Sequence, residues 1–464
     1  MFHRVFASRW TEDFGPIFAE RGRPLEERLA EVYRLYAEQD EGLAVRLGSG
    51  GDGAQRGEYQ KRLDYELELG IWIGPGNALG EPVPLEADVR AADDARAQDD
   101  AAAVAHRLAD RTPTSIFARP ELLRSLAERM KASSADDVIR RLGADLYLDV
   151  QPTVRSPDFE RRANGVLDGD HSYAGQKMIF HDERTFEDLW GVVRRVGEDG
   201  RYVGWVSGPL TGAAGIRDLE DHPFPRPEWI GGEAELARAI AEARRQGRVS
   251  RCFVENPYKV AWYLRGMENL LADYAVDPEF VEALFDRIVP FSTASLLCAV
   301  RAGVDMVAIE GDIAMQDRII AGPERWRAID KPRLAAIIGA CKKLNPEVYV
   351  FFHSDGNLTD VMDDLIEIGF QVIDSIQPEC MDPVRTKQRF GARCTLHGCG
   401  SLQRVLPFGT PEECRAEVRM LVDRCGLDGG LVLRPSNMIG FDVPPENVIA
   451  WYEETMEYVP WVRR

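Results

Sequence analysis

The residues best suited to chemistry in this sequence are a histidine and an aspartate that follow an apolar run. His353 ends the segment VYVFFH and is followed by Ser354, Asp355 and Gly356. Residues i and i+2 of a strand point to the same side, so the side chains of His353 and Asp355 are expected to meet. Such a pair suits a metal ion, or a base with the carboxylate that orients it. The structural alternative is a histidine that caps a loop, with Asp355 in an Asx turn before Gly356.

A second pair repeats this spacing further along the chain. His397 and Cys399 are again two residues apart, and Cys399 has a glycine on either side. A cysteine with so little around it suits a metal ligand or a nucleophile, whereas a small buried cysteine in a tight turn would only pack. We therefore expect His353, Asp355 and Cys399 to bind a metal, and His397 to have a catalytic role.

These residues need elements that bring them together, and the chain from about residue 116 supplies a regular pattern of such elements. Short β-branched runs alternate with helical stretches, which is typical of βαβ units and a parallel sheet. The helices begin at capping signals, such as Asp277-Pro278-Glu279 and Thr410-Pro411-Glu412-Glu413. A doubly wound sheet alternates in the same way, but eight predicted strands indicate an α/β (β/α)8 barrel. The predicted strands are 144–150, 202–208, 252–256, 305–311, 348–354, 371–377, 394–398 and 430–436.

Polar residues gather where the predicted strands end. In a parallel barrel the catalytic residues lie at these carboxyl ends. A single strand end can be polar simply because it emerges into solvent. The convergence of many polar strand ends is what indicates the site. Arg265, in the helical segment 261–274, suits a clamp for a substrate carboxylate or a surface ion pair. The predicted catalytic residues also include Asp149, Glu310 and Asp312, and the predicted substrate-binding residues include Gln151, Arg265, Arg434 and Asn437.

The composition excludes several classes of function. The chain has 464 residues, 45% of them hydrophobic, which is enough for a large core. Its net charge of -20 would repel nucleic acid and anionic lipid. No apolar run approaches the roughly 20 residues needed to span a bilayer, and the N-terminus does not read as a signal peptide. The cysteines form no CxxC pair, so reduced thiols in a cytoplasmic protein are the simplest interpretation.

The first 115 residues differ from the rest of the chain. Residues 24–46 predict an amphipathic helix, which GSGGDG at 48–53 ends. Residues 86–110 are almost all Ala, Asp and Arg, as in an exposed helix or a linker. We therefore predict a mostly helical extension over residues 1–115 and a barrel over residues 116–464.

Longer segments of the chain resemble a known family. Between about residues 120 and 460 the sequence is similar to the uroporphyrinogen decarboxylase superfamily, in particular its methyltransferase-like branch. No single motif is unique to that superfamily, but the order and spacing of the motifs are specific. The segments that carry the resemblance are 262–288, 301–316, 349–379, 405–418 and 429–453.

The resemblance implies a (β/α)8 barrel and two different chemistries. Uroporphyrinogen decarboxylases use no cofactor and hold a tetrapyrrole with arginines and an aspartate; their arginine-rich N-terminal loop is not visible here. The methyltransferase branch binds zinc through His-x-Cys and a later cysteine, and a thiol takes a methyl group from a corrinoid. In this chain Asp355 stands where the cysteine of His-x-Cys is expected, and Ser436-Asn437 stands where the later cysteine is expected. Cys399 would restore one sulfur ligand. Asp312 and Gln316 match an Asp-rich segment of the family that ends in Gln. The resemblance therefore adds Gln316 to the predicted substrate-binding residues.

The leading hypothesis is a metal-dependent methyl or one-carbon transferase that acts on a small organic substrate. The metal would be zinc or another divalent ion, held by His353, Asp355 and Cys399, and Glu310 or Asp312 would complete the shell or act as the base. A corrinoid or a corrinoid protein would be the methyl donor, and superfamily analogy suggests a homodimer.

Two alternatives stay open. The first is a metal-free decarboxylase or lyase, in which Asp149, His353 and Asp355 handle protons while Arg434 or Arg265 holds a carboxylate. The second is a non-catalytic barrel that only binds a ligand, which the density of ionisable strand ends disfavours.

Overall fold

The computed structural model describes residues 106, 110–145, 147–167, 176–198, 200 and 202–462. The chain divides into two units, residues 1–88 and 89–464, and every described residue belongs to the second. The helix predicted at 24–46, and nearly all of the predicted extension and linker, lie outside the described residues.

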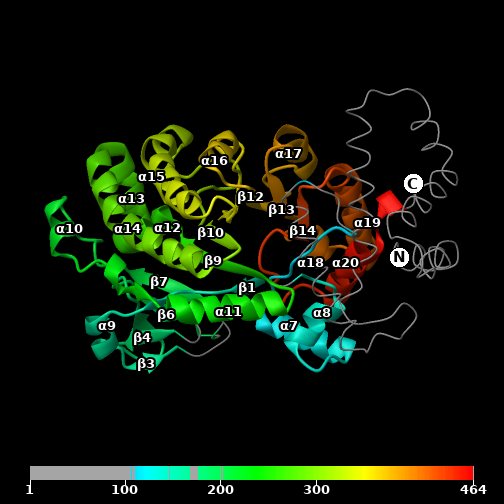
Figure 1. The fold of residues 1–464 in the computed structure, drawn as a ribbon, viewed down its shortest axis with the longest axis horizontal. Helices are drawn as coiled ribbons and strands as arrows, with labels where there is room; N and C mark the ends of the chain where they lie inside the picture. Colours follow the sequence, from blue (N-terminus) through cyan, green and yellow to red (C-terminus); the bar gives the residue numbers. More distant parts are fainter. Residues whose placement is uncertain are drawn as a thin grey trace, which may run out of the picture. The chain divides into compact units, whose positions relative to one another are not determined.

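A parallel sheet forms most of the wall of a barrel, with helices placed around it (Figure 1). Residues 113–115 take the remaining position between the two ends of this sheet. The backbone N–H of Ser115 donates to the carbonyl of Leu433 at 3.1 Å, and that of Asp145 donates to the carbonyl of Thr114 at 2.6 Å. Both bridges are parallel, so this short segment closes the ring and confirms the predicted fold class. The sheet has the order β1 (Tyr147–Asp149), β9 (Val249–Glu255), β10 (Met306–Glu310), β11 (Tyr349–His353), β12 (Val372–Ile376), β13 (Thr395–Gly400) and β14 (Leu431–Pro435).

One strand prediction was wrong, and one barrel segment was not predicted. The run 202–208 is not a barrel strand: it contains β7 (Val203–Ser207), the edge strand of a separate antiparallel sheet. The barrel instead begins at residues 113–115, just before the predicted boundary at residue 116. β-branched and aromatic residues suit either sheet, and the pairing partner decides between them. The antiparallel sheet has the order β3 (Gly165–Val166), β4 (Lys177–Phe180), β5 (Thr185–Glu187), β6 (Val193–Val196) and β7, and β2 (Thr153–Val154) pairs with β8 (Ile230–Gly231).

Two helices begin at the capping signals that the sequence showed. The side chain of Asp277 accepts a hydrogen bond from the backbone N–H of Phe280, and Thr410 and Glu413 form the predicted capping box. The helices are α7 (Pro120–Met130), α8 (Ala135–Arg141), α9 (Pro157–Arg162), α10 (Arg217–Asp221), α11 (Glu233–Arg245), α12 (Pro257–Arg265), α13 (Met267–Val276), α14 (Pro278–Ala302), α15 (Pro323–Leu344), α16 (Met362–Ile368), α17 (Pro383–Phe390), α18 (Val405–Phe408), α19 (Pro411–Leu421) and α20 (Pro445–Glu457), with short helical turns at Pro227–Trp229, Val422–Gly426 and Pro460–Val462.

The alternation of side chains along the strands separates two apolar regions. Outward-facing residues such as Val307 and Ile309 pack under the helices in the main core. α14 is long and apolar enough to cross a membrane by length and composition, but its residues also pack in this main core. The inward-facing residues Met306, Ala308, Phe351 and Val372 form a second cluster inside the barrel.

Candidate functional site

Four ionisable residues stand side by side at one level of the barrel. Glu310 pairs with Glu255 on one side and with His353 on the other, and His353 pairs with Asp374. Glu255, Glu310 and His353 end their strands, and Asp374 lies at the same level in the middle of β12. The expected convergence of polar strand ends therefore arises from strand register.

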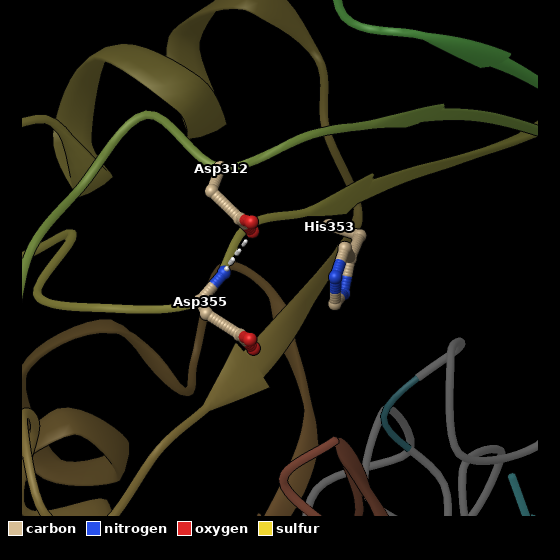
Figure 2. Close-up of side chains that lie close together, drawn as sticks. All are labelled: Asp312, His353 and Asp355. Atoms are coloured by element: carbon tan, nitrogen blue, oxygen red, sulfur yellow. Dashed lines mark hydrogen bonds between the residues drawn. The ribbon is translucent and has the colours of Figure 1, made fainter. Parts of the chain in front are cut away.

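Just beyond this level, three side chains from two neighbouring strands converge. Ligand atoms of Asp312, His353 and Asp355 lie within 4.8 Å of one another (Figure 2). The backbone N–H of Asp355 donates to Oδ1 of Asp312 at 3.0 Å, which ties the two loops together. The amide of Asn437 donates to Oδ2 of Asp355. His353, Asp355 and Asn437, which the sequence assigns to the site, are thus adjacent.

Glycines allow these loops to approach so closely. The N–H of Gly311 donates to the carbonyl of His353 at 3.0 Å, so β10 and β11 stay paired up to Asp312. Gly356 has φ +90°, and a Cβ there would lie 2.6 Å from the carbonyl oxygen of Met315. A side chain at position 356 would therefore push the loop that carries Asp355 away from the loop that carries Asp312.

One oxygen of Asp355 has no partner. Its Oδ1 is buried and makes no hydrogen bond with any described residue. Burial raises the pKa of Asp355 to about 6, although the charge of His353 acts in the opposite direction. A buried carboxylate oxygen without a donor is costly, so this oxygen favours a bound cation or a proton.

A buried aspartate on the next strand organises the residues behind the cluster. The side chain of Asp374 is almost fully buried. Its Oδ2 lies 2.5 Å from Nδ1 of His353, and its Oδ1 lies 2.7 Å from Nδ1 of His397. The guanidinium of Arg434 donates to both oxygens, at 2.6 and 3.2 Å. Asp374 is therefore shared by three cationic or titratable groups.

The pKa shifts in this network have clear causes. Burial opposes ionisation of Asp374, but the charges of Arg434 and His397 outweigh it and hold its pKa well below the ordinary value. Burial also lowers the pKa of His353, but Asp374 reverses the effect and raises that pKa to about 8. For His397 burial prevails and its pKa is lowered. Since Nε2 of His397 contacts Oγ of Ser115 at 3.1 Å, both of its ring nitrogens are engaged.

A second charged network lies within the barrel. Arg251 donates to both oxygens of Asp149, at 2.8 and 3.1 Å, and to Glu310 at 2.6 Å. Its guanidinium also lies 5.4 Å from the ring centroid of Phe351 and 5.8 Å from that of Tyr147. Burial alone would lower the pKa of Arg251, but the two carboxylates raise it. The predicted catalytic residues Asp149 and Glu310 thus share one cation.

Both arginines predicted to hold a substrate carboxylate already have carboxylate partners. Arg434 is bound to Asp374, as described above. Arg265 donates to Asp273 at 2.7 Å and to the carbonyls of Leu210 and Ala213, which ties α12 to the loop after β7. Arg265 thus forms an ion pair, as the alternative predicted, but the pair is mostly buried and not at the surface.

The two glutamines predicted to bind substrate make no hydrogen bond with Asp312, His353 or Asp355 in the described part of the chain. The amide of Gln151 donates to the carbonyl of Phe253 at 3.1 Å, so it supports β9. Gln316 is exposed in the loop after Asp312.

Cys399 is not part of the cluster. Its side chain is fully buried in the main core, and its backbone has φ +75°. Burial raises the pKa of its thiol well above the ordinary value, so the thiolate that metals and electrophiles require is disfavoured. The structural alternative, a buried cysteine in a tight turn, fits this position.

Four charged residues of the mouth, Glu255 among them, were not predicted as site residues. Asp374 could have been found, because a carboxylate inside the apolar run VIDSI needs a buried partner. Arg251 alternates with the outward-facing Cys252, which places it inside the barrel. Nothing in the sequence singles out Lys259, on α12, except its position shortly after β9.

The donor set indicates the kind of metal that fits. Asp312, His353 and Asp355 offer two oxygens and one nitrogen, which suit a hard or borderline divalent ion. Two ligands bound to one such ion lie about 3–4 Å apart, so small rotations would close this cluster. No cysteine joins the cluster in the described part of the chain, so a zinc site built on thiolates does not fit.

Comparisons with known proteins agree on a family and a fold. The family model described as uroporphyrinogen decarboxylase (URO-D) matches residues 206–458, from β7 to the end of α20. A uroporphyrinogen decarboxylase of Legionella pneumophila (strain Lens) is 23% identical over 292 residues, which cover 61% of this chain and 78% of that protein. A methyltransferase from Methanosarcina mazei has a similar structure, with a TM-score of 0.54 and 19% identity over 78% of this chain and 98% of that chain. At this identity the structural likeness shows the fold alone.

Proposed function

This chain belongs to the uroporphyrinogen decarboxylase family, and we propose that within it the protein is a metal-dependent enzyme that transfers a methyl or other one-carbon group of a small organic substrate. The observation that carries this proposal is the convergence of Asp312, His353 and Asp355 within 4.8 Å. The partnerless buried oxygen of Asp355 supports it, because a cation there would satisfy that oxygen.

The chain's own residues have distinct roles in this proposal. Asp312, His353 and Asp355 would hold zinc or another divalent ion. A divalent ion bound there would act as a Lewis acid that withdraws charge from a donor atom of the substrate. Asp374 would keep the proton of His353 on Nδ1 and leave Nε2 for the ion. Glu310, at the same level as His353, would act as the base.

Partners and location follow from the same hypothesis. A corrinoid, free or carried by a protein, is the proposed methyl donor. A homodimer is proposed on superfamily analogy alone. The eight cysteines carry no disulfide, which supports the proposal of a reducing, cytoplasmic location.

A second candidate is a metal-free decarboxylase or lyase. The buried position of Cys399 favours it, since methyl transfer through a zinc thiolate would need sulfur ligands that the cluster lacks. In this case His353, held by Asp374, would deliver a proton to the carbon that loses carboxylate.

One experiment tests the first candidate against the second. Metal-loaded protein is mixed with methylcob(III)alamin and a panel of small thiols, phenols and amines, and methylated products are measured by mass spectrometry. Methylated product from the wild type and none from Asp355→Ala would support methyl transfer. Release of CO₂ from carboxylic acids by metal-free protein, without methylated product, would instead establish the lyase.

A further inference from the structure

Lys259 lies in the first turn of α12, immediately beyond the carboxyl end of β9. It makes no hydrogen bond or ion pair with any residue that the structure describes, although it is half-buried. The other two cations of the mouth, Arg251 and Arg434, are both bound to carboxylates. Lys259 is therefore a cation at the mouth whose donors are available.

The position of Lys259 is fixed by close packing on the strand that leads to Asp312. A Cβ at Gly311 would lie 2.9 Å from Cδ of Lys259 and 3.1 Å from Cβ of Asn256. The lysine stem and Asn256 thus occupy the space that a side chain at position 311 would need. Gly311 directly precedes Asp312, so the lysine borders the Asp312–His353–Asp355 cluster.

A second donor without an acceptor lies at the same place. Asn256 is buried and caps α12, because its Oδ1 accepts from the N–H of Tyr258 at 3.0 Å. Its Nδ2 has no acceptor among the described residues. A lysine in the first turn of a helix is also unfavourable, because the positive end of the helix dipole repels it. An anion near Lys259 and Asn256 would offset that repulsion and satisfy both donors.

The carboxylates near Lys259 do not occupy it. Glu255, Glu310 and Asp312 act on Lys259 through their charges, but none forms an ion pair with it. Glu310 is already bound to Arg251, and the proposed metal ion would offset the charge of Asp312. Glu255 keeps its charge, so an anion that reaches both the ion and Lys259 would be held by these two positive charges against the charge of Glu255.

We propose that Lys259 binds an anionic oxygen of the substrate, of the carboxylate class, beside the Asp312–His353–Asp355 cluster. This inference rests on the proposed function, because the same anion would bridge the lysine and the metal ion. Lys259 would hold the carboxylate of the substrate. Arg265 and Arg434, which were predicted for that role, are already bound to carboxylates of the protein.

Binding of oxalate, a small dicarboxylate, tests the proposal without an assay of activity. Manganese content is first measured in the wild type and in Lys259→Ala, Lys259→Arg and Lys343→Ala, the last a control at an exposed lysine of α15. Each protein is then titrated with oxalate by calorimetry. Lys259→Ala is expected to bind oxalate about tenfold or more weakly, with unchanged metal content, because a charged hydrogen bond is lost. Lys259→Arg and Lys343→Ala are expected to bind oxalate nearly as the wild type does.

The outcomes separate this inference from the proposed function. Equal oxalate affinity in the wild type and Lys259→Ala, at full metal content, overturns the role of Lys259 and leaves the metal cluster standing. A wild type that takes up no metal contradicts the proposed function. In that case weaker oxalate binding by metal-free Lys259→Ala than by metal-free wild type still supports the lysine site, and equal binding overturns it.

Discussion

Nδ1 of His353 lies 2.5 Å from Oδ2 of Asp374, whose side chain is almost fully buried. Asp374 is ionised because its pKa is held well below the ordinary value, mainly by the charge of Arg434 against the cost of burial. The proton between the two groups therefore resides on Nδ1 of His353. In the neutral ring Nε2 is then the nitrogen with a free lone pair, which is the form a metal ligand needs; because the pKa of His353 is raised to about 8, a bound ion displaces the proton of Nε2 at neutral pH.

Asp374→Asn should damage both the fold and the metal cluster. The variant leaves the buried guanidinium of Arg434 without its counter-charge, so we expect a loss of about 3–5 kcal/mol in the free energy of unfolding. Metal affinity should fall about 10–100-fold, because His353 loses the group that orients it. Urea unfolding and metal titration measure the two effects.

The control for this variant is Asp317→Asn. Asp317 forms an exposed ion pair with Arg318, and loss of such a pair costs at most about 1 kcal/mol. If Asp374→Asn were as stable as this control and bound metal as the wild type does, Asp374 would have neither role.

Cys399→Ser should retain metal. The thiol is buried in the main core and is not among the converging ligands, so its loss should leave metal content unchanged. A buried hydroxyl in place of the thiol is expected to lower stability by about 1–3 kcal/mol. Elemental mass spectrometry on the folded variant checks this, and a loss of metal would return Cys399 to the ligand set.

Asp330 should make stability depend on pH. This fully buried residue of α15 accepts a hydrogen bond from the hydroxyl of Tyr274 at 2.8 Å. Burial raises its pKa from 3.8 to about 7, although Tyr274 and Arg333 act in the opposite direction. The folded state therefore binds more protons between these two values, so its contribution is full below 3.8 and is lost as the pH rises towards 7.

Asp330→Asn removes this titration, so the free energy of unfolding should fall less between about pH 4 and about pH 7 than in the wild type. The difference should be at most a few kcal/mol. Urea unfolding at both pH values measures it, with the exposed Asp317→Asn as the control for loss of one carboxylate. Parallel pH dependences in Asp330→Asn and the wild type would refute the assignment.

Much of the fold was predictable because the barrel strands are apolar runs that end in polar residues. Six of the eight predicted runs, from 252–256 to 430–436, overlap barrel strands, and 144–150 contains β1. The strand at residues 113–115 could not be found by composition, because it is only three residues long and is recognised by its pairing with Leu433 and Asp145. The run 202–208 has the composition of a barrel strand, but pairs with β6 in another sheet.

The site was predictable where spacing along one strand decided it, or where a polar residue follows a predicted strand, as Asp312 and Asn437 do. His353 and Asp355 were predicted from their i, i+2 spacing, and the structure brings Asp312 to them from the neighbouring strand. The same spacing at His397 and Cys399 did not have this result, because Cys399 has φ +75° and is buried in the main core. The sharing of Asp374 by His353, His397 and Arg434 depends on register between strands, which local sequence does not carry.

The most direct test of the account is the metal content of purified, untagged protein after incubation with zinc, manganese or iron. The wild type and His181→Ala, a control at an exposed histidine in the turn after β4, should bind one of these ions near-stoichiometrically. His353→Ala and Asp355→Ala should each lose most of it while remaining folded by circular dichroism. If the wild type bound none of the three ions, or if all four proteins bound equal amounts, the metal cluster of Asp312, His353 and Asp355 would be contradicted.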